Sequence, residues 1–205
     1  MSTTELQISD WRRQVAQLYA AVRAEPNPEQ GHALWRAGRD RLFRTHPQSP
    51  LTADDPLRRT GLPYWPYDPD LRFELPVLPM PPVDGATGIA VPTDGDGTTR
   101  MRPIGRVELP APLQASLAVW SLLQYAGGLF VPLRDGTAGS ETYGGGRYAL
   151  DTAKGADLGG EGATLVLDLN FLYHPSCRYN PRWQCPLAPQ DNTVPGVPVR
   201  AGERL

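Results

Sequence analysis

The chain has 205 residues, and its 21 Gly and 23 Pro make up about a fifth of it, against about 12% in an average protein. A charged fraction of 20% and a formal net charge of −2 exclude a highly charged disordered chain and disfavour the basic face that nucleic-acid binding needs. No apolar run approaches the ~20 residues that cross a bilayer, and the N-terminus has no basic and then apolar leader. We therefore expect a cytoplasmic protein that binds neither nucleic acid nor a membrane.

Residues 9–24 predict an amphipathic helix, because their apolar side chains recur on one face of a 3.6-residue period. The residues of that face are Trp11, Val15, Leu18, Tyr19 and Val22. Ser9 is the first residue of this stretch, where its hydroxyl can accept from a free backbone N–H, so we expect it to be the N-cap.

A second helix is predicted to begin at Pro28, because Asn27 is a favourable N-cap and proline suits the first helical position. It should end before Pro47, since the residue that precedes a proline is disfavoured in the α region. We expect residues 1–46 to form an N-terminal helical segment.

A turn-rich stretch follows and contains an aromatic and proline cluster from Tyr64 to Tyr67. From residue 71 the pattern changes to short apolar stretches separated by Gly, Pro and Asp, which is typical of strands. The predicted strands are 71–78, 88–92, 100–109, 115–125, 128–133, 147–151 and 163–171. Turn residues at 94–97 and 126–128 predict hairpins. The aromatic cluster is expected either to pack as an extended arm or to line a cleft.

Short strands without interleaved helices favour an antiparallel sheet closed on itself. The expected fold class is α+β: N-terminal helices packed on a mostly antiparallel, barrel-like sheet, of which a split barrel is one form, with long Pro-rich loops. Residues 47–205 are the expected β-rich domain, which forms one compact unit with the helical segment 1–46. We expect a pocket at one barrel end, roofed by residues 134–148 and by the Pro-rich C-terminal segment.

The segment 134–148 concentrates polar side chains in one Gly-rich connection between two predicted strands. Glycines allow a close approach of the backbone to a ligand, and guanidinium groups suit a carboxylate or phosphate. The candidate substrate-binding residues are Arg134, Thr137, Arg147 and Tyr148, and the candidate catalytic residues are Asp135 and Tyr143. The alternative is a structural turn closed by an Arg134–Asp135 ion pair.

Asp168 and Asn170 are two residues apart on a predicted strand, so their side chains share one face. We expect Asp168 to be catalytic and Asn170 to bind substrate. The alternative is that they cap the loop that follows.

The chain holds two cysteines, Cys177 and Cys185, which do not make a disulfide framework. Together with His174 they could supply three zinc ligands, but their spacing matches no common zinc finger. We predict no metal and keep this set as an alternative. Free thiols are expected, with a disulfide or a nucleophilic Cys177 near His174 as further alternatives.

From about residue 30 to the end, the chain contains a series of short motifs that occur in a fixed order. They include Trp35-Arg36-x-x-Arg39-Asp40, His46–Leu51, Tyr64–Pro69, Arg134-Asp135-x-Thr137, Thr142–Tyr148, Asp168-x-Asn170 and Ala201-Gly202-Glu203. In this combination the chain resembles the bacterial and archaeal family catalogued as domain of unknown function 1684. The resemblance implies a family pattern in the segments 134–148 and 168–185 but brings no activity with it. That family usually has Asn where this chain has His174, which weakens the zinc alternative.

The leading hypothesis is a small-molecule-binding protein that acts as an enzyme, by acid–base chemistry, on an anionic substrate held by the Arg- and Tyr-rich loop. Hydrolysis, elimination or isomerisation fits these residue types better than redox chemistry, and a biosynthetic enzyme is one form of the hypothesis. We predict no cofactor. One alternative is a barrel that binds FMN or haem, and another is an interaction module with an exposed aromatic patch at Tyr64, Trp65 and Tyr67. A homodimer is left open.

Overall fold

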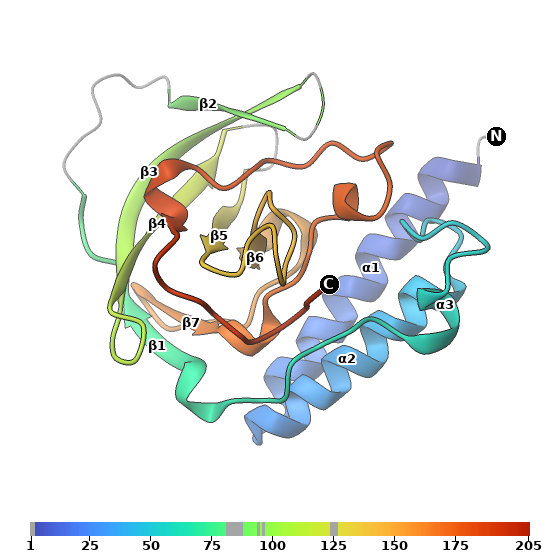
Figure 1. Cartoon of the computed structure of the whole chain (residues 1–205), viewed down its shortest axis with the longest axis horizontal. Helices are drawn as coiled ribbons and strands as arrows, with labels where there is room; N and C mark the ends of the chain where they lie inside the picture. The colour runs from blue at the N-terminus through green and yellow to red at the C-terminus, as the bar shows by residue number, and fades with distance from the viewer. Residues whose placement is uncertain (1–2, 81–87, 94, 96, 124–126) are drawn as a thin grey trace.

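The computed structural model describes residues 3–80, 88–93, 95, 97–123 and 127–205. It confirms the α+β class, because N-terminal helices pack against a curled, antiparallel, barrel-like sheet (Figure 1). None of the helices in these ranges is long and apolar enough to cross a membrane. Residues 94, 96 and 124–126, which belong to the two predicted hairpin turns and to the end of the strand predicted at 115–125, lie outside the described residues.

Two long helices lie side by side along one flank of the sheet (Figure 1). They are α1 (Thr3–Ala24) and α2 (Pro28–Thr45), and a short helix α3 (Leu57–Thr60) follows. Gly38 of α2 sets how closely the long helices approach, because a Cβ there would lie 2.5 Å from Cδ1 of Leu18 on α1.

The two helix starts differ in how well the sequence predicts them. The predicted cap of α2 is confirmed, since the Gln30 N–H donates to Oδ1 of Asn27 at 3.1 Å. The predicted cap of α1 is wrong, because the helix already begins at Thr3 and Ser9 lies inside it. No helix breaker stands before Ser9, and Glu5 in the first turn favours the positive end of the helix dipole.

The main sheet is antiparallel with the strand order β2-β3-β4-β5-β6, and a short strand pairs parallel to β5. Its strands are β2 (Ile89–Pro92), β3 (Thr98–Leu109), β4 (Ala115–Leu122), β5 (Leu129–Asp135), β6 (Arg147–Asp151) and β8 (Thr193–Val194). Sequence analysis predicted these strands except β8, because the C-terminal region has no periodic pattern.

A second, two-stranded ribbon joins β1 (Arg72–Pro76) and β7 (Thr164–Asp168) antiparallel to each other. The chain after β1 pairs with β3 at one antiparallel bridge, where the Leu78 N–H donates to the Arg106 carbonyl at 2.8 Å. A glycine at position 105 allows this close approach, because a Cβ there would lie 2.5 Å from Val77. The ribbon therefore closes the open side of the curled sheet.

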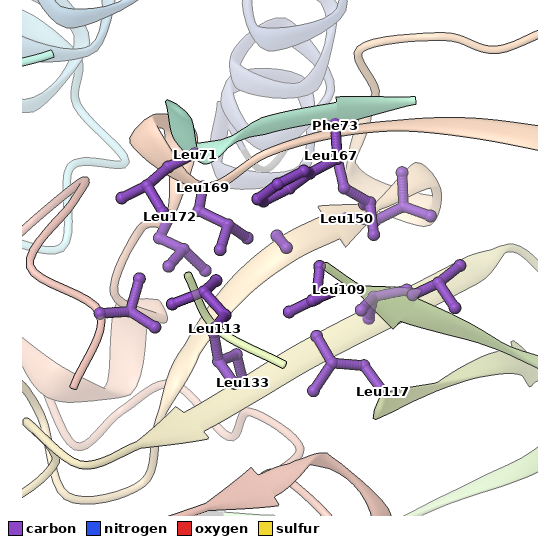
Figure 2. Packing of buried hydrophobic residues seen from close by; sticks show 14 of the residues in the cluster. Leu71, Phe73, Leu109, Leu113, Leu117, Leu133, Leu150, Leu167, Leu169 and Leu172 are labelled. Carbon is purple, nitrogen blue, oxygen red and sulfur yellow. The ribbon is translucent and has the colours of Figure 1, made fainter. Parts of the chain in front are cut away.

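Leucine side chains fill the interior of the curled sheet (Figure 2). They come from β3, β4, β5, β6 and β7 and from the turns beside them, and the labelled leucines are Leu71, Leu109, Leu113, Leu117, Leu133, Leu150, Leu167, Leu169 and Leu172. Nearly all of this side-chain surface is removed from water, at roughly 25 cal/mol per Å² of apolar area. The barrel is therefore a packed core.

Aromatic side chains form the layer between the helices and the sheet. Trp35 of α2 lies 5.5 Å from Tyr64 and 5.1 Å from Phe171, measured between ring centroids, and its Nε1 donates to Tyr19 Oη at 3.1 Å. Tyr64 is buried here, so the expected exposed aromatic patch is wrong at this residue. The stretch from Tyr64 instead packs as an extended arm.

The last residues of the chain form a strap, which we define as residues 197–205 (Figure 1). Arg147 of β6 holds this strap by hydrogen bonds to its backbone. The Arg147 side chain is completely buried and donates to the carbonyls of Val199 at 2.7 Å, of Glu203 at 3.0 Å and of Ala201. Its guanidinium also lies 3.4 Å from Oδ2 of Asp135. Burial lowers the pKa of Arg147 to about 10, although Asp135 opposes this shift.

We predict that Arg147→Met lowers the free energy of unfolding by about 3–5 kcal/mol, because it leaves a buried carboxylate and strap carbonyls without their donor. Urea unfolding measures the change. The matched control is Arg134→Gln, whose guanidinium is exposed and donates to the Gly144 carbonyl at 2.8 Å. The control should stay within about 0.5 kcal/mol of the parent. Equal effects of the two substitutions would contradict this role of Arg147.

Candidate functional site

The loop 134–148 folds back on its own backbone and on the strap. Asp135 accepts from the Thr137 hydroxyl at 2.9 Å and from the Val199 N–H at 2.6 Å, and Thr137 lies 2.9 Å from the Thr142 hydroxyl. All three loop side chains are buried. The structure thus brings the predicted residues Asp135, Thr137 and Arg147 together, but around the chain's own backbone.

The pair Asp168 and Asn170 ties the aromatic arm to the sheet. Asp168 accepts from the backbone N–H of Asn170 at 3.0 Å, which caps the turn η3 (Leu169–Phe171), and from the Tyr67 hydroxyl at 3.2 Å. The Asn170 amide donates to the Asp68 carbonyl at 2.8 Å and accepts from the Asp68 N–H at 2.9 Å. Burial raises the pKa of Asp168, although hydrogen bonds from Asn170 oppose this shift. These contacts are the ones expected if Asp168 and Asn170 cap the loop that follows the strand.

His174 connects the loop to a buried ion pair. Its Nε2 accepts from the Tyr143 N–H at 3.2 Å, and its Nδ1 lies 3.6 Å from Glu203. Glu203 also accepts from Arg39 Nε at 2.6 Å, from the His174 N–H at 2.5 Å and from the Tyr179 hydroxyl at 3.2 Å. Burial lowers the pKa of His174 to about 4, so the ring is neutral and accepts the Tyr143 N–H while it lies beside Glu203.

The described part of the structure offers no cluster of ligands for the zinc ion that was considered as an alternative. Within the part of the chain that the structure describes, no three His, Cys, Asp or Glu side chains group in a way that could hold a metal ion. Both nitrogens of His174 face protein partners instead of the two cysteines.

A cleft lies along α1, apart from the network of Asp135, Thr137 and Arg147. Its outer cavity holds about 260 Å³ and adjoins an inner cavity of about 60 Å³, and the two share Trp11, Lys154 and Ser176. The outer lining is completed by Ile8, Arg12, Gln48, Trp183, Gln184 and Cys185. We call both cavities together the α1 cleft. Of the predicted binding residues, Tyr148 lines it, in the inner cavity.

Two cations lie at the outer cavity. Lys154 is about half exposed and its Nζ lies 3.8 Å from Oδ2 of the buried Asp151, which is a long ion pair. Arg12 is exposed and makes no hydrogen bond or ion pair with any of the described residues. Burial raises the pKa of Asp151, although Lys154 opposes this shift. Both cations can therefore turn to a ligand.

Two indoles form the apolar part of the outer cavity, Trp11 from α1 and Trp183 from the Pro-rich C-terminal region. Nε1 of Trp183 is buried and has no acceptor among the described residues. A buried N–H without an acceptor costs about 1–3 kcal/mol.

Cys185 lies in the wall of the same cavity. Contacts with Cys177 and Ser176, together with the charge of Lys154, lower the pKa of Cys185 against the opposing effect of burial. Both cysteines are free and buried, and no disulfide joins them.

Sequence reasoning missed Trp11, Arg12, Lys154 and Trp183 as site residues. These residues come from distant segments, and only Trp11 was named among them, as part of the apolar face of the predicted helix 9–24.

One family model and one solved structure match the chain. The profile of the family described as "Protein of unknown function (DUF1684)" matches residues 59–204. A solved structure also matches, the solution NMR structure of an uncharacterized protein from gene locus rrnAC0354 of Haloarcula marismortui. It is 34% identical, covers 83% of this chain and 90% of that chain, and gives a TM-score of 0.57. No curated protein matches the chain.

The buried imidazoles predict a loss of stability in mild acid. Burial lowers the pKa of His32 and of His174 to about 4 each, from 6.5. The unfolded chain takes up these protons below pH 6.5 and the folded chain only near pH 4, so the free energy of unfolding falls as the pH drops through this window.

His174→Asn removes one of these groups and keeps a donor and an acceptor. Urea unfolding at about pH 7.5 and pH 4.5 should show a smaller loss for the variant than for the parent, by roughly 2 kcal/mol. The same loss in both proteins would show that His174 does not stay neutral in the folded chain.

Proposed function

The chain belongs to the DUF1684 family of proteins of unknown function, and we propose that it binds an anionic aromatic small molecule in the α1 cleft. The observation that carries the proposal is the pairing of two cations, Arg12 and Lys154, with two indoles around one cavity of about 260 Å³. Apolar walls with a few placed polar groups are typical of small-molecule sites.

The positive charges at the outer cavity favour a ligand with an anionic group. Lys154 and Arg12 face one nearby carboxylate, Asp151, which is buried and already within 3.8 Å of Lys154. The cavity therefore has an excess of positive charge, and hydrogen bonds to a charged group contribute about 1.5–3 kcal/mol each. This excess favours a carboxylate, phosphate or sulfonate.

The indole side chains at the outer cavity favour a ligand with an aromatic ring. Trp11 and Trp183 offer ring faces, and rings stack or meet edge to face with such surfaces. The guanidinium of Arg182 lies 4.8 Å from the Trp183 ring centroid and holds the indole in place.

This proposal keeps the expected anionic small molecule but moves its site from the loop 134–148 to the α1 cleft. An acid–base reaction at the bound anion would use Lys154, with Asp151 positioning it, in place of Asp135 and Asp168. FMN belongs to the proposed ligand class, because it joins an aromatic ring system to a phosphate.

Matched pairs of ligands test the proposal, with benzoate against benzamide and FMN against riboflavin. We predict that at least one anion binds about tenfold more tightly than its neutral partner, which is about 1.4 kcal/mol. Arg12→Gln and Lys154→Gln should each weaken anion binding and leave the neutral partner unchanged. Ligand-observed NMR and flavin fluorescence measure the dissociation constants.

Arg59→Gln is the matched control, because Arg59 is an exposed arginine on α3 that does not line the cleft. Equal affinity for each anion and its neutral partner would refute the proposal. So would a loss of anion binding in the Arg59 variant as large as in the Lys154 variant.

A further inference from the structure

We propose that the ligand of the α1 cleft is an aromatic carboxylate, which places its ring in the outer cavity and its carboxylate in the inner cavity. This inference rests on the proposed function and narrows it from anions in general to one class of anion. The sizes of the two cavities and the hydrogen-bond donors of the inner cavity support it.

The two cavities differ in what they can hold. A cavity of about 150 Å³ accepts a benzene ring, whereas one water needs about 10–15 Å³. The outer cavity of about 260 Å³ therefore has room for an aromatic ring, and the inner cavity of about 60 Å³ has room only for a group of a few atoms. Because Trp11 and Lys154 line both cavities, a ring that packs on Trp11 can direct a small polar group inward.

Arg39 of α2 brings a guanidinium to the inner cavity. Its Nε and Nη2 donate to Glu203 at 2.6 and 3.2 Å, and its Nη2 also donates to the His174 carbonyl at 3.3 Å. Its Nη1 has no hydrogen-bond partner among the described residues. The Arg39 side chain lines the cavity and is 13% exposed, whereas Glu203 is completely buried and lines neither cavity. A ligand in the cavity can therefore reach Arg39 but not the carboxylate that balances its charge.

Two aromatic rings hold this guanidinium in place. Cζ of Arg39 lies 4.5 Å from the ring centroid of Phe43 and 4.8 Å from that of Tyr173, and both rings line the inner cavity. Together with the bonds to Glu203, these contacts fix the orientation of the guanidinium. A donor that is already in position loses little side-chain entropy when a ligand binds.

The other polar groups of the inner cavity add donors. The Tyr19 oxygen accepts from Nε1 of Trp35 at 3.1 Å, which leaves its own O–H without an acceptor among the described residues. Lys154 and Ser176 supply further donors where the two cavities meet. None of the described residues that line the inner cavity is an aspartate or a glutamate. Such a lining favours a group that only accepts hydrogen bonds, as an ionised carboxylate does.

Size and acceptor strength separate a carboxylate from the other anions. The inner cavity has room for roughly four waters, which is enough for the flat carboxylate group with space to turn toward its donors. A sulfonate is tetrahedral and bulkier, and it is a weaker base that accepts weaker hydrogen bonds. A phosphate is bulkier still and carries up to about two negative charges. The inner cavity therefore favours the carboxylate.

The test measures dissociation constants for the full-length protein by ligand-observed NMR, with pairs of anions that share a ring and a chain length. The pairs are phenylacetate with phenylmethanesulfonate and 3-phenylpropionate with 2-phenylethanesulfonate. In at least one pair the carboxylate should bind about tenfold more tightly than the sulfonate. Equal affinities within both pairs would overturn the inference.

Val15 of α1 tests where the carboxylate lies, because it lines the inner cavity and not the outer one. Val15→Phe should fill the inner cavity and reduce carboxylate binding to the level of the sulfonate, whereas Val15→Ala should keep the preference. Thermal unfolding shows whether both variants fold. An unchanged preference in folded Val15→Phe would contradict the placement.

Tyr19→Phe tests the donors independently of cavity size. Loss of the hydroxyl should weaken carboxylate binding about tenfold and leave sulfonate binding unchanged. Tyr64→Phe is the matched control, because Tyr64 is also buried beside Trp35 but lines neither cavity. Carboxylate affinities that are the same in Tyr19→Phe and Tyr64→Phe would overturn the inference.

The outcomes distinguish this inference from the proposed function. If carboxylates and sulfonates bind equally, and both bind more tightly than the neutral phenylacetamide, the cleft binds anions but the carboxylate does not occupy the inner cavity. If the anions bind no more tightly than phenylacetamide, the proposed function fails and the inference fails with it.

Discussion

The buried carboxylate of Glu203 holds three parts of the molecule together. Its balancing charge is the guanidinium of Arg39 on α2, with Nε at 2.6 Å, and its other donors are the His174 N–H and the Tyr179 hydroxyl. Burial raises the pKa of Glu203, but Arg39 and His174 lower it by more, so the carboxylate is ionised. A lone buried charge costs several kcal/mol, so helix α2, the segment that holds His174 and the strap have to be in place together.

The position of the α1 cleft depends on this arrangement. Helix α1 has no ion pair of its own with Glu203 among the described residues, and it packs on α2 through contacts such as Leu18 against Gly38. The strap in turn fixes Arg147, which holds the loop 134–148 closed. One ion pair therefore sets where the helices meet the sheet, and the cleft forms at that boundary, between α1 and the segments that hold Lys154 and the two cysteines.

The helices and strands can be predicted well from the sequence. The spacing of apolar residues and the positions of turn residues are local signals that do not depend on the rest of the fold. The sequence does not predict the site, because the walls of the cleft meet only in the folded chain. The loop 134–148 was misleading for a physical reason: a polar network that satisfies buried backbone uses the same residue types as a binding loop, and Asp135 with Arg147 is such a network.

A double-mutant cycle of Arg39→Met and Glu203→Gln tests the central claim most directly. Urea unfolding should show that each single substitution lowers the free energy of unfolding by about 3–5 kcal/mol, and that the double variant loses less than the sum by at least about 1.5 kcal/mol. Small effects, each below about 1 kcal/mol and additive within about 0.5 kcal/mol, would contradict the claim that this ion pair joins the helices to the sheet.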